Sequence, residues 1–205
     1  MRTFVWILAG AIGLAVIVFS AGLIFLKTRT NGFSARSQPT AFETMAAQTA
    51  RAMAIPSKAK EEKNPVANSK EVLADAKVHW ADHCALCHGN DGSGQSEFGQ
   101  RMYPPSPDMR KERTQGLTDG ELFYIIENGI RLTGMPSWGG SEAGEQDSWK
   151  LVHFIRHLPA LSASEIMEME KLNPKSPAEL EEEKLEEQFL KGQPVTPKLQ
   201  QQHHH

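Results

Sequence analysis

The chain has 205 residues and a formal net charge of −3, with 40% hydrophobic and 23% charged residues. This length allows one modest domain with additional segments. The charge is uneven, at +1 for residues 1–26, +4 for 27–69, and −4 for each of 70–160 and 161–205. No segment combines enough basic charge with aromatic residues to indicate nucleic-acid binding, so nucleic acid is excluded as a partner.

An uncharged apolar run, FVWILAGAIGLAVIVFSAGLIFL, occupies residues 4–26. As a helix this run extends about 34 Å, which is enough to cross a hydrocarbon core of about 30 Å. A cleaved signal peptide is the alternative, but its apolar region is usually shorter and precedes a small-x-small cleavage site, which is not evident here. We therefore predict that residues 1–27 form an uncleaved transmembrane anchor that contacts the lipid bilayer through residues 4–26.

The following segment, residues 28–69, is poor in large apolar side chains and contains the polar stretch IPSKAKEEKNPVANS. This composition predicts a flexible linker. Within it, residues 41–54 favour a short helix with a weak apolar stripe. One face of this helix holds Phe42, Met45, Gln48, Thr49 and Ala52. The helix is interpreted either as part of the linker or as a docking helix for a partner.

Both cysteines of the chain lie in the motif HCALCHG, residues 83–89. A thioredoxin-like dithiol requires a βαβ setting, and no strand-like alternation surrounds the motif. A structural zinc site needs four ligands, usually from two cysteine or histidine pairs, and no second pair matches. Covalent haem c needs two thiols at this spacing, followed at once by a histidine that ligates iron. Cys84, Cys87 and His88 supply that set, so the motif predicts one covalently bound haem c.

The second axial ligand of the iron is expected to be a methionine or histidine further along the chain. The candidates are Met102, Met109, Met135, His153 and His157. The two histidines are spaced as neighbours on one helix face, and a solvated or partly packed face is the simpler explanation for them. Met135 lies between Gly134 and Pro136 in a glycine-rich loop, where the chain is held extended. We predict Met135 as the ligand.

Five segments of residues 70–160 follow one another in a familiar order: VHWADHCALCHGNDGSG, YPPSPDM, GLTDGELFYIIENGI, TGMPSWG and SWKLVHFIRHL. Together they resemble the small class I monohaem cytochromes c of the bacterial type. The resemblance implies an all-α domain of three main helices around one haem. It also implies that a carbonyl of Pro104 or Pro105 accepts a hydrogen bond from the proximal imidazole. One departure is Ala76, where the family often has glycine at the crossing of the first and last helices.

Local patterns place the three helices of this domain. A partly apolar first helix leads directly into the haem cysteines. A capping box of Thr118 and Glu121 opens the second helix, and Gly129 ends it. The third helix runs from about Gln146 to Leu158. The inward side chains of the second and third helices are predicted to be Leu122, Phe123, Ile125, Ile126, Trp149, Val152, Phe154 and Ile155. Trp138 and Arg131, close to the Met135 loop, either contact a haem propionate or are surface residues.

The acidic tail, residues 161–205, lies outside the segments that carry the resemblance. A capping box of Ser176 and Glu179 predicts a charged helix that Gly192 ends. This helix is either solvated, in a partly disordered tail, or a strap on a partner subunit, as Phe189 and Leu190 among its charges suggest. The terminal histidines, residues 203–205, are interpreted as a tag remnant without a role.

These predictions describe an electron carrier without enzymatic activity of its own. A thioether and an imidazole fill both axial positions, which leaves no open position for bond chemistry at the iron. The chain is either a tethered carrier or a fixed subunit of a respiratory or dehydrogenase complex, with redox proteins as partners. A haem-based sensor in which Met135 dissociates is the alternative.

Haem c attachment takes place outside the cytoplasm, as the resemblance implies. We therefore predict a single-pass protein of the cytoplasmic membrane with its amino terminus inside and its haem domain on the periplasmic face. This prediction overrides the basic residues Lys27, Arg29 and Arg36 after the apolar run, which mildly favour the opposite orientation.

Overall fold

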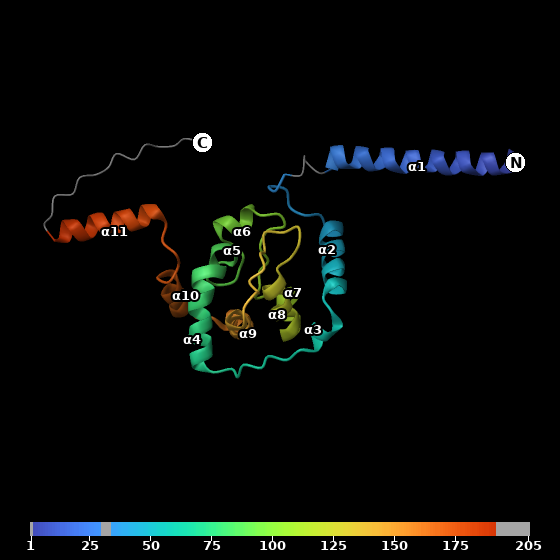
Figure 1. Ribbon diagram of the computed structural model, residues 1–205. Coiled ribbons are helices and arrows are strands. Elements are labelled where there is room, and N and C mark those ends of the chain that lie inside the picture. Colours follow the sequence, from blue (N-terminus) through green and yellow to red (C-terminus); the bar gives the residue numbers. More distant parts are fainter. Residues whose placement is uncertain (1, 30–33, 192–205) are drawn as a thin grey trace.

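The computed structural model describes residues 2–29 and 34–191, and every regular element within these ranges is a helix (Figure 1). The core of the domain is formed by α4 (Lys70–His79), α8 (Asp119–Asn128) and α9 (Glu142–His157). The shorter elements around it are α3 (Ser57–Glu61), α5 (Ala85–His88), α6 (Glu97–Arg101), α7 (Glu112–Gln115), a 3₁₀ turn (Leu158–Ala160) and α10 (Ala163–Glu170). The predicted all-α domain with three main helices is therefore confirmed.

The first core helix begins at Ser69, whose side chain accepts a hydrogen bond from the Val72 N–H group. α4 continues through a π-helical turn (Trp80–Cys84) into α5. Such a turn inserts an extra residue into the helix and is frequent at functional sites. Ala76 and Trp80 are each 1% exposed, and the Trp80 ring centroid lies 5.5 Å from that of Phe154 on α9. The two cysteines therefore lie directly after the core helix α4.

The second and third core helices form as their local signals predict. Thr118 and Glu121 make the reciprocal hydrogen bonds of a capping box at the start of α8, and Gly129 ends this helix with a φ of 65°. Phe123 on α8 stacks on Trp149 of α9, with ring centroids 4.0 Å apart. The inward residues of α9 are all buried, namely Trp149, Val152, Phe154 and Ile155. α9 begins earlier than predicted because Ser141 caps it.

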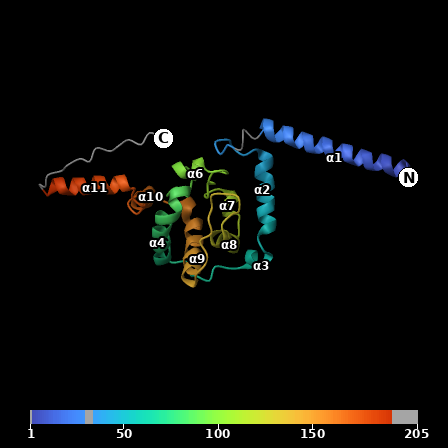
Figure 2. The same ribbon diagram turned by 45° about the horizontal axis from the view of Figure 1, so that its top comes forward.

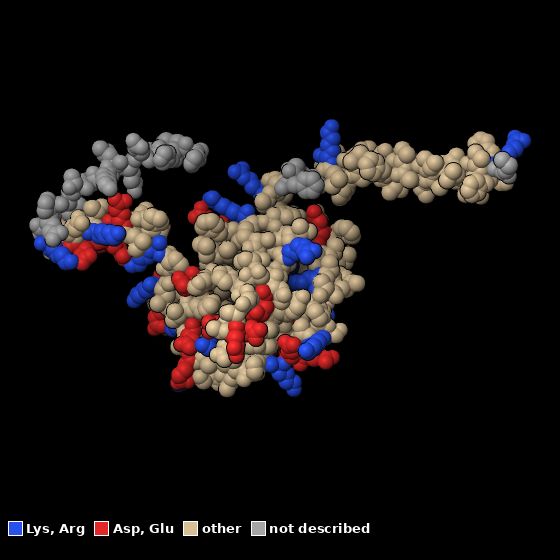
Figure 3. Space-filling view, in the orientation of Figure 1, with Lys and Arg blue, Asp and Glu red and all other residues tan. Residues whose placement is uncertain are grey.

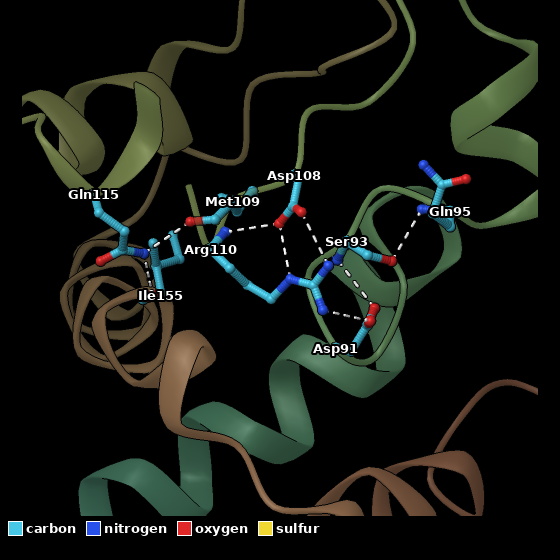
Figure 4. Close-up of polar contacts among 8 residues, drawn as sticks. All are labelled: Asp91, Ser93, Gln95, Asp108, Met109, Arg110, Gln115 and Ile155. Atoms are coloured by element: carbon cyan, nitrogen blue, oxygen red, sulfur yellow. Dashed lines mark hydrogen bonds and ion pairs between the residues drawn. The ribbon is translucent and has the colours of Figure 1, made fainter. Parts of the chain in front are cut away.

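A network of polar contacts attaches the loops of the domain to one another (Figure 4). Arg110 donates to both oxygens of Asp108, at 2.8 and 2.9 Å, and to Asp91 at 3.0 Å. Gln115 donates to the main-chain carbonyl of Ile155 on α9, at 2.9 Å. The loop that follows the cysteine motif is thereby fixed to the chain before α7, and α7 is in turn fixed to the core.

The apolar run of the sequence forms α1 (Arg2–Arg29), which projects from the domain on the side opposite α11 (Pro177–Leu190) (Figure 1 and Figure 2). The part from Arg2 to Thr28 is long and apolar enough to cross a membrane, and its side chains are exposed. Figure 3 shows basic side chains at its ends and an uncharged surface between them. Length and composition are consistent with a single membrane span.

The segment predicted to be a flexible linker is partly folded against the domain. It contains α2 (Ala41–Ala54), which a capping box of Thr40 and Glu43 opens, and it continues into α3. Ile55, between these helices, is 5% exposed. A Cβ atom at Gly120 of α8 would lie 1.9 Å from the Ala59 carbonyl oxygen, so α3 reaches α8 only because this residue is glycine.

Two further contacts attach the end of this segment to α9. The Asn64 amide donates to the Trp149 carbonyl at 2.8 Å, and the His153 ring lies 2.7 Å from the Val66 carbonyl oxygen. These contacts, like that at Gly120, involve main-chain groups. The prediction of flexibility rested on a shortage of large apolar side chains, and such a count does not detect main-chain contacts.

The packed domain also extends beyond the boundary predicted at residue 160. Met169 of α10 is 0% exposed and belongs to the core cluster. Lys77 and Glu168 form an ion pair at 2.7 Å between α4 and α10. α11 has the predicted capping box of Ser176 and Glu179, and none of its residues is buried. Gly192 and the terminal histidines lie outside the described residues.

Replacing Met169 with alanine is expected to lower the free energy of unfolding by about 2–5 kcal/mol, because the truncation leaves a cavity in a fully packed core. Thermal and urea denaturation of the haem-loaded protein would measure this loss. Met167→Ala, on the same helix at 58% exposure, is the matched control, and we expect a change of less than about 0.5 kcal/mol. Equal stability of both variants would contradict the assignment of α10 to the domain.

Candidate functional site

The motif of two cysteines and a histidine is held at the end of α4 by its own helical turns. Cys84 ends the π-helical turn, and Cys87 and His88 lie in α5. Gly89 then turns the chain with a φ of 75°, a conformation that favours glycine. The buried Trp80 indole donates to the Gly89 carbonyl at 3.1 Å. The core therefore fixes the position at which the chain leaves the motif.

The next loop closes back on the motif through its main chain. The Gly94 N–H donates to the His88 carbonyl at 2.8 Å, and the Ser96 hydroxyl donates to the Cys87 carbonyl at 2.9 Å. A Cβ atom at Gly99 would lie 2.1 Å from the same Cys87 carbonyl oxygen. These contacts leave little freedom for the motif backbone, so its side chains project from a rigid base.

A cavity of about 710 Å³ opens above this base, within the size range of cofactor sites. It brings together most of the side chains that the sequence predicts for a haem site. These are Cys84, Cys87, His88, Met102, Pro104, Pro105, Met135 and Trp138. Arg131, Met109, His153 and His157 do not line it. The two histidines contact Val66 and Glu165 instead, in agreement with the partly packed helix face predicted for them.

The loop that carries Met135 is folded by hydrogen bonds of its own. The Met135 N–H donates to the Thr133 hydroxyl at 3.1 Å, and the Met135 carbonyl accepts from the Ile130 N–H at 3.1 Å. Gly129 packs so closely on this loop that a Cβ atom there would lie 2.6 Å from the Pro136 carbonyl carbon. The end of α8 therefore positions the methionine at the cavity.

A second thioether lies beside the first. A Cβ atom at Gly134 would lie 2.0 Å from the Met102 sulfur, so Met102 packs directly on the residue before Met135. Met102 and Met135 both line the cavity. The cavity therefore offers two thioethers in addition to the imidazole of His88.

The imidazole of His88 is half-buried, and desolvation by the surrounding protein lowers its pKa to about 4. The ring is therefore neutral near pH 7, with a nitrogen lone pair able to bind a metal. Its Nδ1 atom is buried and has no hydrogen-bond partner among the described residues. The hydrogen bond predicted from this ring to a carbonyl of Pro104 or Pro105 is thus not formed in the structure, although both prolines line the same cavity.

The thiols are also electrically neutral in this setting. Burial raises the pKa of Cys84 to about 12, and the neighbouring Cys87 adds to the rise. Burial also raises the pKa of Cys87. A structural zinc site requires four nitrogen or sulfur ligands, and the described residues contain no cluster of three or more histidine, cysteine or acidic residues able to hold a metal ion. The donors instead fit haem c, which is attached through two cysteines and takes axial ligands of the imidazole and thioether types.

Sequence reasoning missed one wall of the cavity, which α2 provides. The apolar face named in the sequence is turned away from the domain, since Phe42 and Met45 are 71% and 59% exposed. Thr44, Ala47 and Arg51, from another face, line the cavity instead. The apolar stripe gave no signal of this contact, because α2 faces the cavity with Glu43 and with small and basic side chains.

A helical domain in which a CxxCH motif and a methionine loop share one cavity is typical of c-type cytochromes. In agreement, residues 71–155 match the family model described as cytochrome c oxidase, cbb3-type, subunit III. The match supports a cytochrome c domain. The matched range does not include α1, α2, α3 or the two helices of the tail, α10 and α11. A comparison with curated proteins found no match. The match covers less than half of the chain, so it supports a cytochrome c domain within it, and such a domain implies haem-based electron transfer.

Proposed function

We propose that the chain transfers electrons through a single haem c, bound covalently by Cys84 and Cys87 with His88 and Met135 as axial ligands. The observation that carries the proposal is the convergence of these four side chains on one cavity. The haem iron supplies a one-electron exchange between its ferrous and ferric forms. His88 and Met135 would occupy both axial positions of the iron, which would leave none open to oxygen or peroxide, so electrons would pass without bond chemistry.

We further infer that α1 anchors the domain in the cytoplasmic membrane, with the amino terminus inside and the haem on the outer face. The apolar α1 supports the anchor, and the family description supports a place in a respiratory complex. On α11, Phe189 and Leu190 are 73% and 76% exposed among acidic residues. Such exposed apolar side chains suit a strap on a partner subunit.

Extraction of native membranes with a mild detergent, followed by size separation and haem staining, tests this proposal. We expect the chain to migrate in a large assembly and to dissociate from it in a stronger detergent, because helix packing and charged contacts hold such subunits together. Migration of the stained chain alone would instead favour a tethered carrier. Recovery of the chain in the soluble fraction without detergent would contradict the membrane anchor.

A further inference from the structure

The wall that α2 contributes to the cavity comes from outside the segment that matches the cytochrome family. Thr44, Ala47 and Arg51 follow one another at intervals of three or four residues, so they share one helix face. The first two are small enough to let the helix approach a flat cofactor. The third brings a guanidinium group to the same cavity.

Arg51 is unusual among the basic residues because its guanidinium is partly buried without a partner. Its Nε atom is inaccessible to solvent and makes no hydrogen bond with any described residue. Burial lowers the pKa of Arg51, and the nearby Arg113, which also lines the cavity, lowers it further. Two like charges facing one cavity cost free energy unless an anion lies between them.

Neither nearby carboxylate supplies this anion. Glu121 of α8 attracts Arg51 electrostatically, but its carboxylate accepts a hydrogen bond from the Thr118 N–H at 2.9 Å in the capping box of α8. Glu43, on the same helix as Arg51, is engaged by the Thr40 N–H at 2.7 Å in the capping box. The matching anion is therefore expected from the occupant of the cavity. Haem carries two propionate carboxylates, and the planar fork of a guanidinium matches a carboxylate with two parallel hydrogen bonds.

The position of α2 is fixed rather than incidental. The Lys60 ammonium group donates to the Ala52 carbonyl at 2.6 Å and so ties α3 to the last turn of α2. Ile55, between the two helices, is buried. Since α3 is seated on Gly120 of α8, the end of α2 that carries Arg51 is attached to the domain. Figure 1 and Figure 2 both show α2 running alongside the α7 and α8 side of the domain.

We propose that α2 is a built part of the haem site and that Arg51, together with Arg113, binds the haem propionates. This inference rests on the proposed function, because it takes haem as the occupant of the cavity. It replaces Arg131, which the sequence offered for a propionate and which is exposed and does not line the cavity. The helix between membrane and cytochrome domain is thereby a cover for the cofactor that also sets its electrostatic environment.

The test is a potentiometric titration of the full-length, haem-loaded protein in detergent, with Arg51→Gln compared with the wild type. Loss of the guanidinium leaves propionate charge uncompensated, which favours the ferric form. We expect the ferrous-to-ferric ratio at a fixed ambient potential to fall by about tenfold, which corresponds to about 59 mV for a one-electron couple. Arg51→Lys keeps the charge without the fork, so a smaller fall in the same direction is expected.

Arg101→Gln is the matched control, because Arg101 has a 78% exposed side chain paired with Glu97 on α6, and we expect no shift. Covalent haem in Arg51→Gln with a wild-type potential would overturn the inference while leaving the proposed function intact. A fall in Arg131→Gln in place of Arg51→Gln would also overturn it. Absence of covalent haem from the wild-type chain would instead refute the proposed function. Should Arg51→Gln not accumulate, an unshifted Arg51→Lys would overturn the inference.

Discussion

A double variant with Cys84→Ala and Cys87→Ala is expected to retain no haem after denaturation. In this variant only His88 and Met135 remain to hold the group, and ligand bonds of this kind are lost when the protein unfolds. Haem staining after denaturing electrophoresis measures the loss directly. Because a ligand that binds only the folded state stabilises it by mass action, we also expect the thermal midpoint to fall steeply, as the cavity of about 710 Å³ is left without a permanent occupant.

His79→Gln is a suitable control for this experiment. His79 is on α4, five residues before Cys84, and does not line the haem cavity. It should stain like the wild type. Stain retained by the double variant would contradict covalent attachment. Stoichiometric zinc in the wild-type protein, with no haem, would contradict the cofactor assignment altogether.

The parts of the fold that the sequence predicts well are those with local causes. The capping boxes at Thr118 and Ser176 form because both partners of each box lie within four residues along the chain. Gly129 ends α8 because glycine adopts a positive φ without a steric penalty. The motif of Cys84, Cys87 and His88 was equally readable, since haem attachment fixes a spacing that few other chemistries share.

The parts that escaped prediction depend on contacts between distant segments. Arg51 faces the cavity because α3 rests on Gly120, and nothing within residues 41–54 reveals that contact. Met169 is buried because α10 turns back onto the core after the 3₁₀ turn at residues 158–160. Periodicity assigns a helix face by its apolar residues. Periodicity therefore fails for a helix face that contacts the occupant of a cavity rather than other apolar side chains.

Replacing Met135 with alanine is expected to lower the reduction potential by on the order of 0.1 V, within the about 0.8 V range over which axial ligands set haem potentials. A thioether raises the potential relative to other ligands, and its removal also leaves one axial position without a protein ligand. The reduced variant should therefore bind carbon monoxide promptly, whereas the wild type should not. Potentiometric titration and the visible spectrum with carbon monoxide measure the two effects.

Met102→Ala is the decisive comparison, because the Met102 sulfur packs on Gly134 beside Met135 and lines the same cavity. If Met135 is the ligand, the Met102→Ala variant should have a reduction potential close to that of the wild type, and its reduced form should not bind carbon monoxide. The reverse pattern would move the ligand role to Met102. Two separately unaffected variants, with an effect only in the double variant, would mean that either thioether can serve. Prompt binding of carbon monoxide to the wild type would contradict a stable methionine ligand and favour a haem-based sensor over an electron carrier.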